Sequence, residues 1–67
     1  MIEIKVNGET RMTDEGVTLA GLIADLGLDP KTVAALVNDE IVERERFDAT
    51  GVKAGDTVEL VRFVPGG

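Results

Sequence analysis

The end of the sequence, Pro65-Gly66-Gly67, carries the group best suited to chemistry. Two glycines without side chains fit a channel too narrow for other residues, so the carboxylate of Gly67 can reach a nucleotide inside a partner enzyme. Attack of that carboxylate on the α-phosphate of ATP makes an acyl-adenylate, which a sulfur nucleophile can open to a thiocarboxylate. A terminal glycine pair indicates little by itself, but after the pattern of strands and helix described below it favours Gly67 as the modified residue, with Gly66 and Pro65 threading the partner's active site. The competing interpretation is an inert, frayed terminus.

A cluster of carboxylates is the second candidate for chemistry, and its members are Asp39, Glu40, Glu43 and Glu45. An acid–base pair or a site for a hard cation can be built from such groups. These four, however, fall in a predicted turn and in a loop of mixed charge, which is typical of solvated surface. Their spacing also lacks the regularly alternating oxygen donors of a calcium loop, so we predict no metal site.

Catalysis by the chain itself is not expected, because it contains no histidine, cysteine or tyrosine. The glycine-rich segment 51–56 does not match the phosphate-loop pattern and is not followed by a predicted helix, so it indicates turns. We predict a protein without catalytic residues and without a bound cofactor of its own, which serves as a co-substrate of partner enzymes.

The composition limits the kind of partner. Among 67 residues, 13 are acidic and 7 are basic, which gives a formal net charge of −6. Such a chain repels the phosphate backbone of nucleic acids and complements a partner with a basic docking surface. The first residues form no basic stretch followed by an apolar block, and no apolar run is long enough to span a membrane. We expect a cytoplasmic protein that binds neither nucleic acid nor membrane.

The N-terminal residues predict a β-hairpin. Ile2, Ile4 and Val6 alternate with charged residues, which is the period of a strand with one buried face. Asn7-Gly8 suits a two-residue turn with positive φ angles, so residues 9–12 should return antiparallel.

A single amphipathic helix is predicted over residues 19–26. Thr18 is suited to cap it, and Gly27 is suited to end it in the left-handed conformation. Its apolar positions have the spacing of one helical face and are Leu19, Leu22, Ile23 and Leu26.

Three further extended segments are expected in the second half of the chain. Residues 33–37 and a brief segment at Ile41 and Val42 form strands joined by a tight turn. The polar loop 43–50 is anchored by Phe47, its one large apolar residue. Residues 57–64 are dense in β-branched residues and predict a closing central strand that lies beside the first strand.

This order of elements predicts an α+β protein with the ubiquitin-like β-grasp fold, in which a mixed sheet of four to five strands packs on one helix. Residues 1–64 should form a single domain, and residues 65–67 a flexible tail, because proline cannot extend a sheet ladder and glycines add no packing surface.

An exposed apolar patch is predicted on the sheet face that the helix does not cover. In the closing strand, Val61 and Phe63 alternate with the core-facing residues, so they point outward. Ala34 and Leu36 join them if the odd-numbered residues of 33–37 point inward. Such a patch near the tail is a candidate docking surface for an activating enzyme. In the alternative register, Phe63 covers the rim of the core instead.

Over its full length, the sequence resembles a known family among the prokaryotic ubiquitin-like proteins. This family is that of the sulfur carriers of thiamine biosynthesis. The segments that carry the resemblance are Met1-Ile2-Glu3-Ile4, Asn7-Gly8, Val17-Thr18-Leu19, the run from Val37 to Val42, the run from Gly55 to Val61, and Val64-Pro65-Gly66-Gly67. The closing strand with its tail is the most specific of them.

The resemblance implies a cycle in which a ubiquitin-activating-type enzyme adenylates Gly67 with ATP and magnesium. A sulfur donor relay, such as a cysteine desulfurase, then converts Gly67 to a thiocarboxylate, and thiazole synthase accepts the sulfur. Two related functions stay open at this point. One is that of the small subunit of molybdopterin synthase, which also ends in Gly-Gly, and the other is that of a protein modifier conjugated through Gly67.

Overall fold

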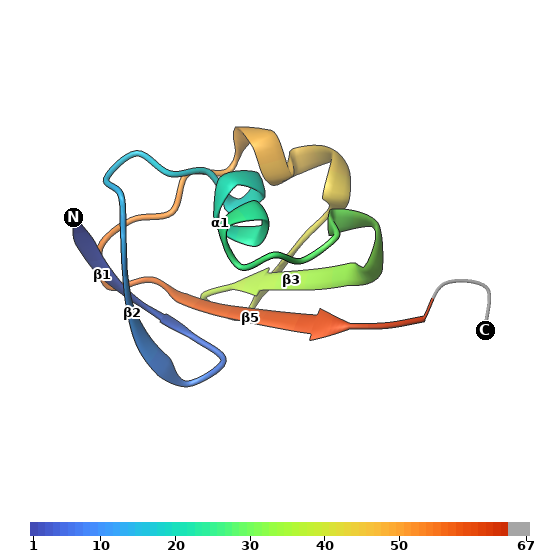
Figure 1. The fold of residues 1–67 in the computed structure, drawn as a ribbon, viewed down its shortest axis with the longest axis horizontal. Helices are drawn as coiled ribbons and strands as arrows, with labels where there is room; N and C mark the ends of the chain where they lie inside the picture. Colours follow the sequence, from blue (N-terminus) through green and yellow to red (C-terminus); the bar gives the residue numbers. More distant parts are fainter. Residues whose placement is uncertain (65–67) are drawn as a thin grey trace.

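In the computed structural model, which describes residues 1–64, the alternating N-terminal residues form the predicted hairpin (Figure 1). Strands β1 (Ile2–Val6) and β2 (Glu9–Thr13) pair antiparallel. Asn7 and Gly8 join them with φ angles of 51° and 82°, as a two-residue turn between twisted strands requires. The return strand is one residue longer than predicted.

The helix α1 (Leu19–Asp25) forms where the apolar spacing predicts it. Its first turn is capped by Thr18, whose Oγ1 accepts a hydrogen bond from the N–H of Gly21 at 3.1 Å. At the other end, Gly27 has a φ of 73°. Its N–H donates to the carbonyl of Ala24, while the N–H of Leu28 donates to that of Ile23. This pair of bonds satisfies the last carbonyls of the helix and ends it.

The second half of the chain begins with a short 3₁₀ helix, η1 (Pro30–Thr32), that leads into β3 (Val33–Val37). Strand β4 (Glu40–Val42) follows after a tight turn at Asn38-Asp39, whose φ angles of 51° and 69° are both positive. The two predicted strands and their turn are confirmed.

The closing strand β5 (Thr57–Arg62) lies at the centre of a five-stranded sheet with the order β2-β1-β5-β3-β4. It runs parallel to β1 and antiparallel to β3. The predicted central position beside the first strand is correct, and so is the mixed sheet. The predicted length is wrong, because β5 ends at Arg62 instead of Val64. One more bond, from the N–H of Phe63 to the carbonyl of Thr32 at 2.9 Å, continues the pairing with the β3 side.

The segment predicted as a loop, residues 43–50, contains a six-residue 3₁₀ helix, η2 (Arg44–Ala49). Its mixed charges hide any apolar period, which is why the pattern does not indicate a helix. The predicted anchor is confirmed, since Phe47 is only 3% exposed and belongs to the core cluster. The hydroxyl of Thr50 donates to the carbonyl of Arg46 at 2.7 Å and closes the last turn of η2.

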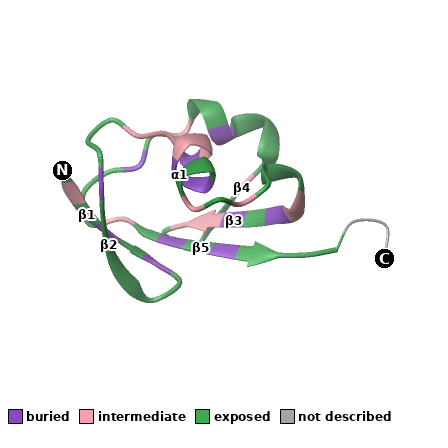
Figure 2. Ribbon diagram, viewed as in Figure 1, coloured by how far each residue is buried: buried purple, intermediate pink, exposed green. Residues whose placement is uncertain are grey.

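The core lies between the sheet and the two helices that cover one of its faces. Figure 1 shows α1 and η2 on the same side of the sheet, and Figure 2 shows the buried residues concentrated in the layer between them. Among residues 1–64, no helix lies against the opposite face. In the same part of the chain, no helix is long and apolar enough to cross a membrane.

We expect Leu22→Ala to lower the free energy of unfolding by about 2 to 5 kcal/mol, since truncation of a packed core leucine loses contacts and leaves a cavity. Leu22 is 2% exposed at the centre of the helix face. Urea denaturation followed by circular dichroism measures the change. Met12→Ala, at an exposed position of β2, is the control and should change stability by less than about 0.5 kcal/mol. A similar small effect at Leu22 would contradict the assigned core.

Candidate functional site

The face of the sheet without helices carries a group of apolar side chains from β3 and β5. In β5, Val58 and Leu60 are buried, while Val61 is 53% exposed and Phe63, one residue past the strand, is 48% exposed. Figure 2 shows this alternation of buried and exposed residues along β5. Since successive side chains of a strand point to opposite faces, Val61 and Phe63 point away from α1.

The strand register brings the predicted docking residues together. Ala34 lies directly opposite Val61 in the antiparallel pair of β3 and β5, so their side chains share one face at close range. Ala34 is exposed and Leu36 is half-buried, while Val33 and Ala35 are buried. We call the group Ala34, Leu36, Val61 and Phe63 the outer patch. The alternative register, with Phe63 over the core rim, is wrong because the helix side is filled by Val58 and Leu60.

Two residues beside the outer patch were not included in the prediction. Ile41 lies opposite Leu36 in the pairing of β3 with β4 and is 78% exposed. Glu59 lies opposite Leu36 on the other side, in β5, so it places a carboxylate beside the apolar residues. The alternation of side-chain directions along residues 40–42 indicates that Ile41 and Val42 point to opposite faces of the sheet. Only the register of β4 against β3 shows that Ile41 is on the outer face.

The predicted modified residue Gly67 and the threading residues Gly66 and Pro65 lie outside the described residues. The structure does describe the chain up to Val64. Of the outer patch, Val61 lies in β5 and Phe63 follows one residue after the strand, directly before the last described residue.

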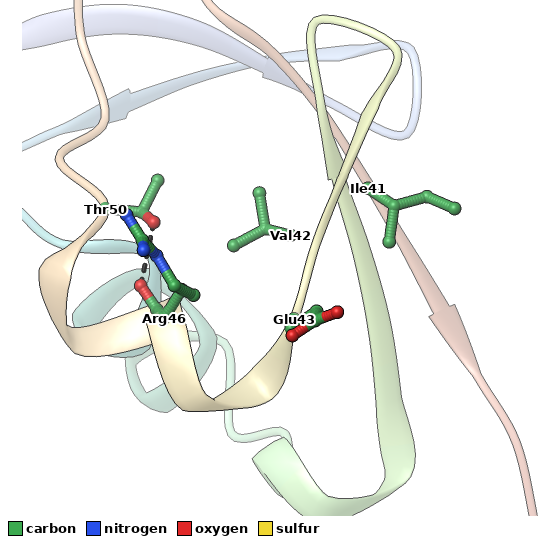
Figure 3. Close-up of a pocket in the computed structure, with 5 residues that line it drawn as sticks. All are labelled: Ile41, Val42, Glu43, Arg46 and Thr50. Atoms are coloured by element: carbon green, nitrogen blue, oxygen red, sulfur yellow. Dashed lines mark hydrogen bonds between the residues drawn. The ribbon is translucent and has the colours of Figure 1, made fainter.

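The carboxylate cluster of Asp39, Glu40, Glu43 and Glu45 is exposed throughout. A shallow hollow of about 330 Å³ lies beside it between β4 and η2, and its lining residues are Ile41, Val42, Glu43, Arg46 and Thr50. Figure 3 shows Val42 between β4 and Thr50, whereas Ile41 extends from the other side of β4. In residues 1–64, no group of three or more histidine, cysteine, aspartate or glutamate side chains is arranged to hold a metal ion. This region fits solvated surface.

The five-stranded mixed sheet with one helix across it defines a ubiquitin-like β-grasp protein. Comparison with solved structures agrees, since a crystal structure of a thiamine biosynthesis protein (ThiS) from Geobacter metallireducens superimposes with a TM-score of 0.84. It is 38% identical, and the match covers 98% of this chain and 100% of that one.

Residues 4–67 match the ThiS family. The sulfur carrier protein ThiS from Thermus thermophilus is 36% identical over 62 residues, which cover 92% of this chain and 95% of that protein. The chain therefore belongs to the ThiS family, the sulfur carriers of thiamine biosynthesis.

A larger protein contains a similar region. A thiazole synthase from Magnetococcus marinus is 36% identical over 66 residues, which are 98% of this chain but only 20% of that protein. The chain thus spans about a fifth of the length of this relative.

Two neighbouring positions test the two faces of β5. Leu60→Lys should lower the free energy of unfolding by at least about 2 kcal/mol, because it replaces buried apolar packing by a charge. Val61→Lys should change it by less than about 1 kcal/mol, because this side chain is already in contact with water. Urea denaturation of both variants decides the assignment. Equal losses would mean that the outer face is covered in solution.

Proposed function

We propose that the chain carries sulfur as a thiocarboxylate on Gly67 and donates it to thiazole formation. The observation that carries this proposal is the family match, which runs from residue 4 through Gly66 and Gly67. The strand that precedes the glycine pair in the sequence is the central strand of the sheet, so the folded domain leads up to the last described residue.

The chemistry proceeds in two steps on partner enzymes. First, a ubiquitin-activating-type enzyme uses ATP and Mg²⁺, and the Gly67 carboxylate attacks the α-phosphate, which releases pyrophosphate and forms the acyl-adenylate. A hydrosulfide equivalent then attacks the carbonyl carbon and expels AMP, which leaves the thiocarboxylate. Where the sulfur arrives as a persulfide, a second thiol cleaves the resulting acyl disulfide. Both partners supply the catalytic groups, and the chain supplies the reacting carboxylate.

Thiazole synthase is the proposed acceptor of the sulfur. Support comes from the synthase of Magnetococcus marinus, in which a region similar to this chain is part of the same polypeptide. A cysteine desulfurase or a similar relay is the proposed donor. Because the first step consumes ATP, we assign the cycle to the cytoplasm.

The outer patch is the proposed docking surface for these partners. Half-exposed Val61 and Phe63 offer apolar area that binding removes from water. Glu59 beside them, together with the net charge of −6, favours a partner with basic residues around an apolar depression. Charge of opposite sign raises the rate of encounter, and apolar contact slows dissociation.

The intact mass of the protein purified from its native host tests the sulfur-carrier function. We expect a species heavier by the difference between one sulfur and one oxygen atom, with the shift confined to the C-terminal peptide. Covalent conjugates to other proteins would instead indicate a protein modifier. If only the unmodified mass is found, and an added activating enzyme with ATP does not adenylate Gly67, the proposal is wrong.

Deletion of Gly66 and Gly67 should abolish thiocarboxylate formation while the midpoint of thermal unfolding stays unchanged, because the core cluster lies entirely within residues 4–60. Differential scanning calorimetry and the mass assay give the two readouts. A large fall in thermal stability would contradict a purely chemical role of the pair.

Val61→Asp should weaken binding to the activating enzyme about tenfold or more, since it places a charge in the centre of the apolar contact. Glu59→Lys should lower the association rate and its dependence on salt, with a smaller effect on dissociation. Met12→Asp, an exposed apolar residue of β2, is the matched control. Surface plasmon resonance measures all three, and equal binding of Val61→Asp and wild type would rule out the outer patch.

A further inference from the structure

The side chain of Asn7 bonds to the backbone of β5 at two points. Its Oδ1 accepts a hydrogen bond from the N–H of Leu60 at 2.8 Å, and its Nδ2 donates to the carbonyl of Leu60 at 3.2 Å. The two residues are 53 positions apart in the sequence. One amide thus satisfies both backbone groups of one residue in the central strand.

This contact lies where β1 leaves the sheet. The backbone N–H of Asn7 still donates to the carbonyl of Val58 at 2.9 Å, but at Asn7-Gly8 the chain turns into β2. A side-chain amide has the same donor and acceptor as a peptide group. The Asn7 side chain therefore supplies the next rung of the parallel ladder after the backbone of β1 has turned away.

This rung holds β5 just before its last residues, Val61 and Arg62. On the β3 side, the last bond to β5 and its extension comes from Phe63 to Thr32 at 2.9 Å. On the β1 side, within residues 1–64, the last bonds are the two between the side chain of Asn7 and the backbone of Leu60. The last described part of the chain is thus held on both edges, at Leu60 from the β1 side and at Phe63 from the β3 side.

We propose that Asn7 is a positioning residue for the sulfur-carrier reaction, because its side-chain amide holds β5 at Leu60, directly before the residues of the outer patch in this strand. This role rests on the proposed function of Gly67. Without the amide, the segment from Leu60 to Phe63 is held from the β3 side alone, so Val61 and Phe63 of the outer patch take a wider range of positions. A partner must then restrict that range on binding, which raises the KM for the carrier, while the bound state and its kcat stay the same.

Asn38 provides a matched control within the same chain. It also begins a two-residue turn, and its φ of 51° equals that of Asn7. Its Oδ1 accepts from the N–H of Thr57, and its Nδ2 donates to the carboxylate of Asp56, both at 3.0 Å. These bonds hold the beginning of β5, at the end of the strand remote from the tail.

Asn7→Gly and Asn38→Gly are the variants to compare, because glycine adopts a positive φ without strain and keeps each turn while both side-chain bonds are lost. Amide hydrogen exchange measured by NMR needs no partner. In Asn7→Gly, exchange at Leu60 should rise about three- to tenfold beyond any global change, because its N–H loses its acceptor. Exchange at Phe63 should rise with it, because the segment that follows Leu60 opens more often. In Asn38→Gly, the increase should fall on Thr57 and spare Phe63.

Steady-state release of pyrophosphate by the activating enzyme gives the functional readout. Asn7→Gly should raise the KM for the carrier about three- to tenfold with kcat unchanged, whereas Asn38→Gly should leave both constants near those of the wild type. Equal KM values in the two variants, or unchanged exchange at Leu60 and Phe63 in Asn7→Gly, would overturn the role of Asn7 alone. Failure of the wild-type chain to be adenylated would overturn the proposed function, and this role with it.

Discussion

The central position of β5, bonded to β1 on one edge and to β3 on the other, constrains the rest of the structure. Its inward residues must fill the space under α1, so Val58 and Leu60 are buried. The two neighbouring strands then have to bring their own apolar residues to the same side, as Ile4 and Ala35 do. The helix, the 3₁₀ segment and the hairpins complete a core whose centre is this one strand.

In the proposed function, the same strand also separates stability from recognition. Its helix-facing residues belong to the core, while Val61 and Glu59 on its other face are exposed. Because the two sets alternate along the sequence, each can change without altering the other. A family whose members share a core can therefore differ in the partners that they bind.

Local patterns were sufficient for most of the fold. The alternation at Ile2–Val6, the turn at Asn7-Gly8 and the cap at Thr18 are features of neighbouring residues, and each formed as expected. The outer patch was also predictable, because successive side chains of a strand point to opposite faces. Once Val58 and Leu60 are assigned to the core, Val61 and Phe63 must lie on the outer face.

What sequence reasoning missed depends on contacts between distant segments. The 3₁₀ helix at Arg44–Ala49 has no apolar period, and burial of Phe47 against α1 is what organises it. The face of Ile41 follows only from the register of a three-residue strand. The hydrogen bonds between Asn7 and Leu60 join residues that are 53 positions apart. The dipeptide Asn7-Gly8 predicts a turn, but it does not indicate which residues the Asn7 side chain contacts.

The topology also has a consequence for how the protein is made. The central strand is the last described element to leave the ribosome, about 50 residues after the strand that it pairs with in parallel. Until it emerges, the core cluster that contains Ile4 and Leu22 lacks Val58 and Leu60, so we expect no cooperatively folded domain. A chain broken off before β5 stays unfolded and is open to proteolysis. A folded domain therefore requires translation through β5, and degradation removes the chains that lack it.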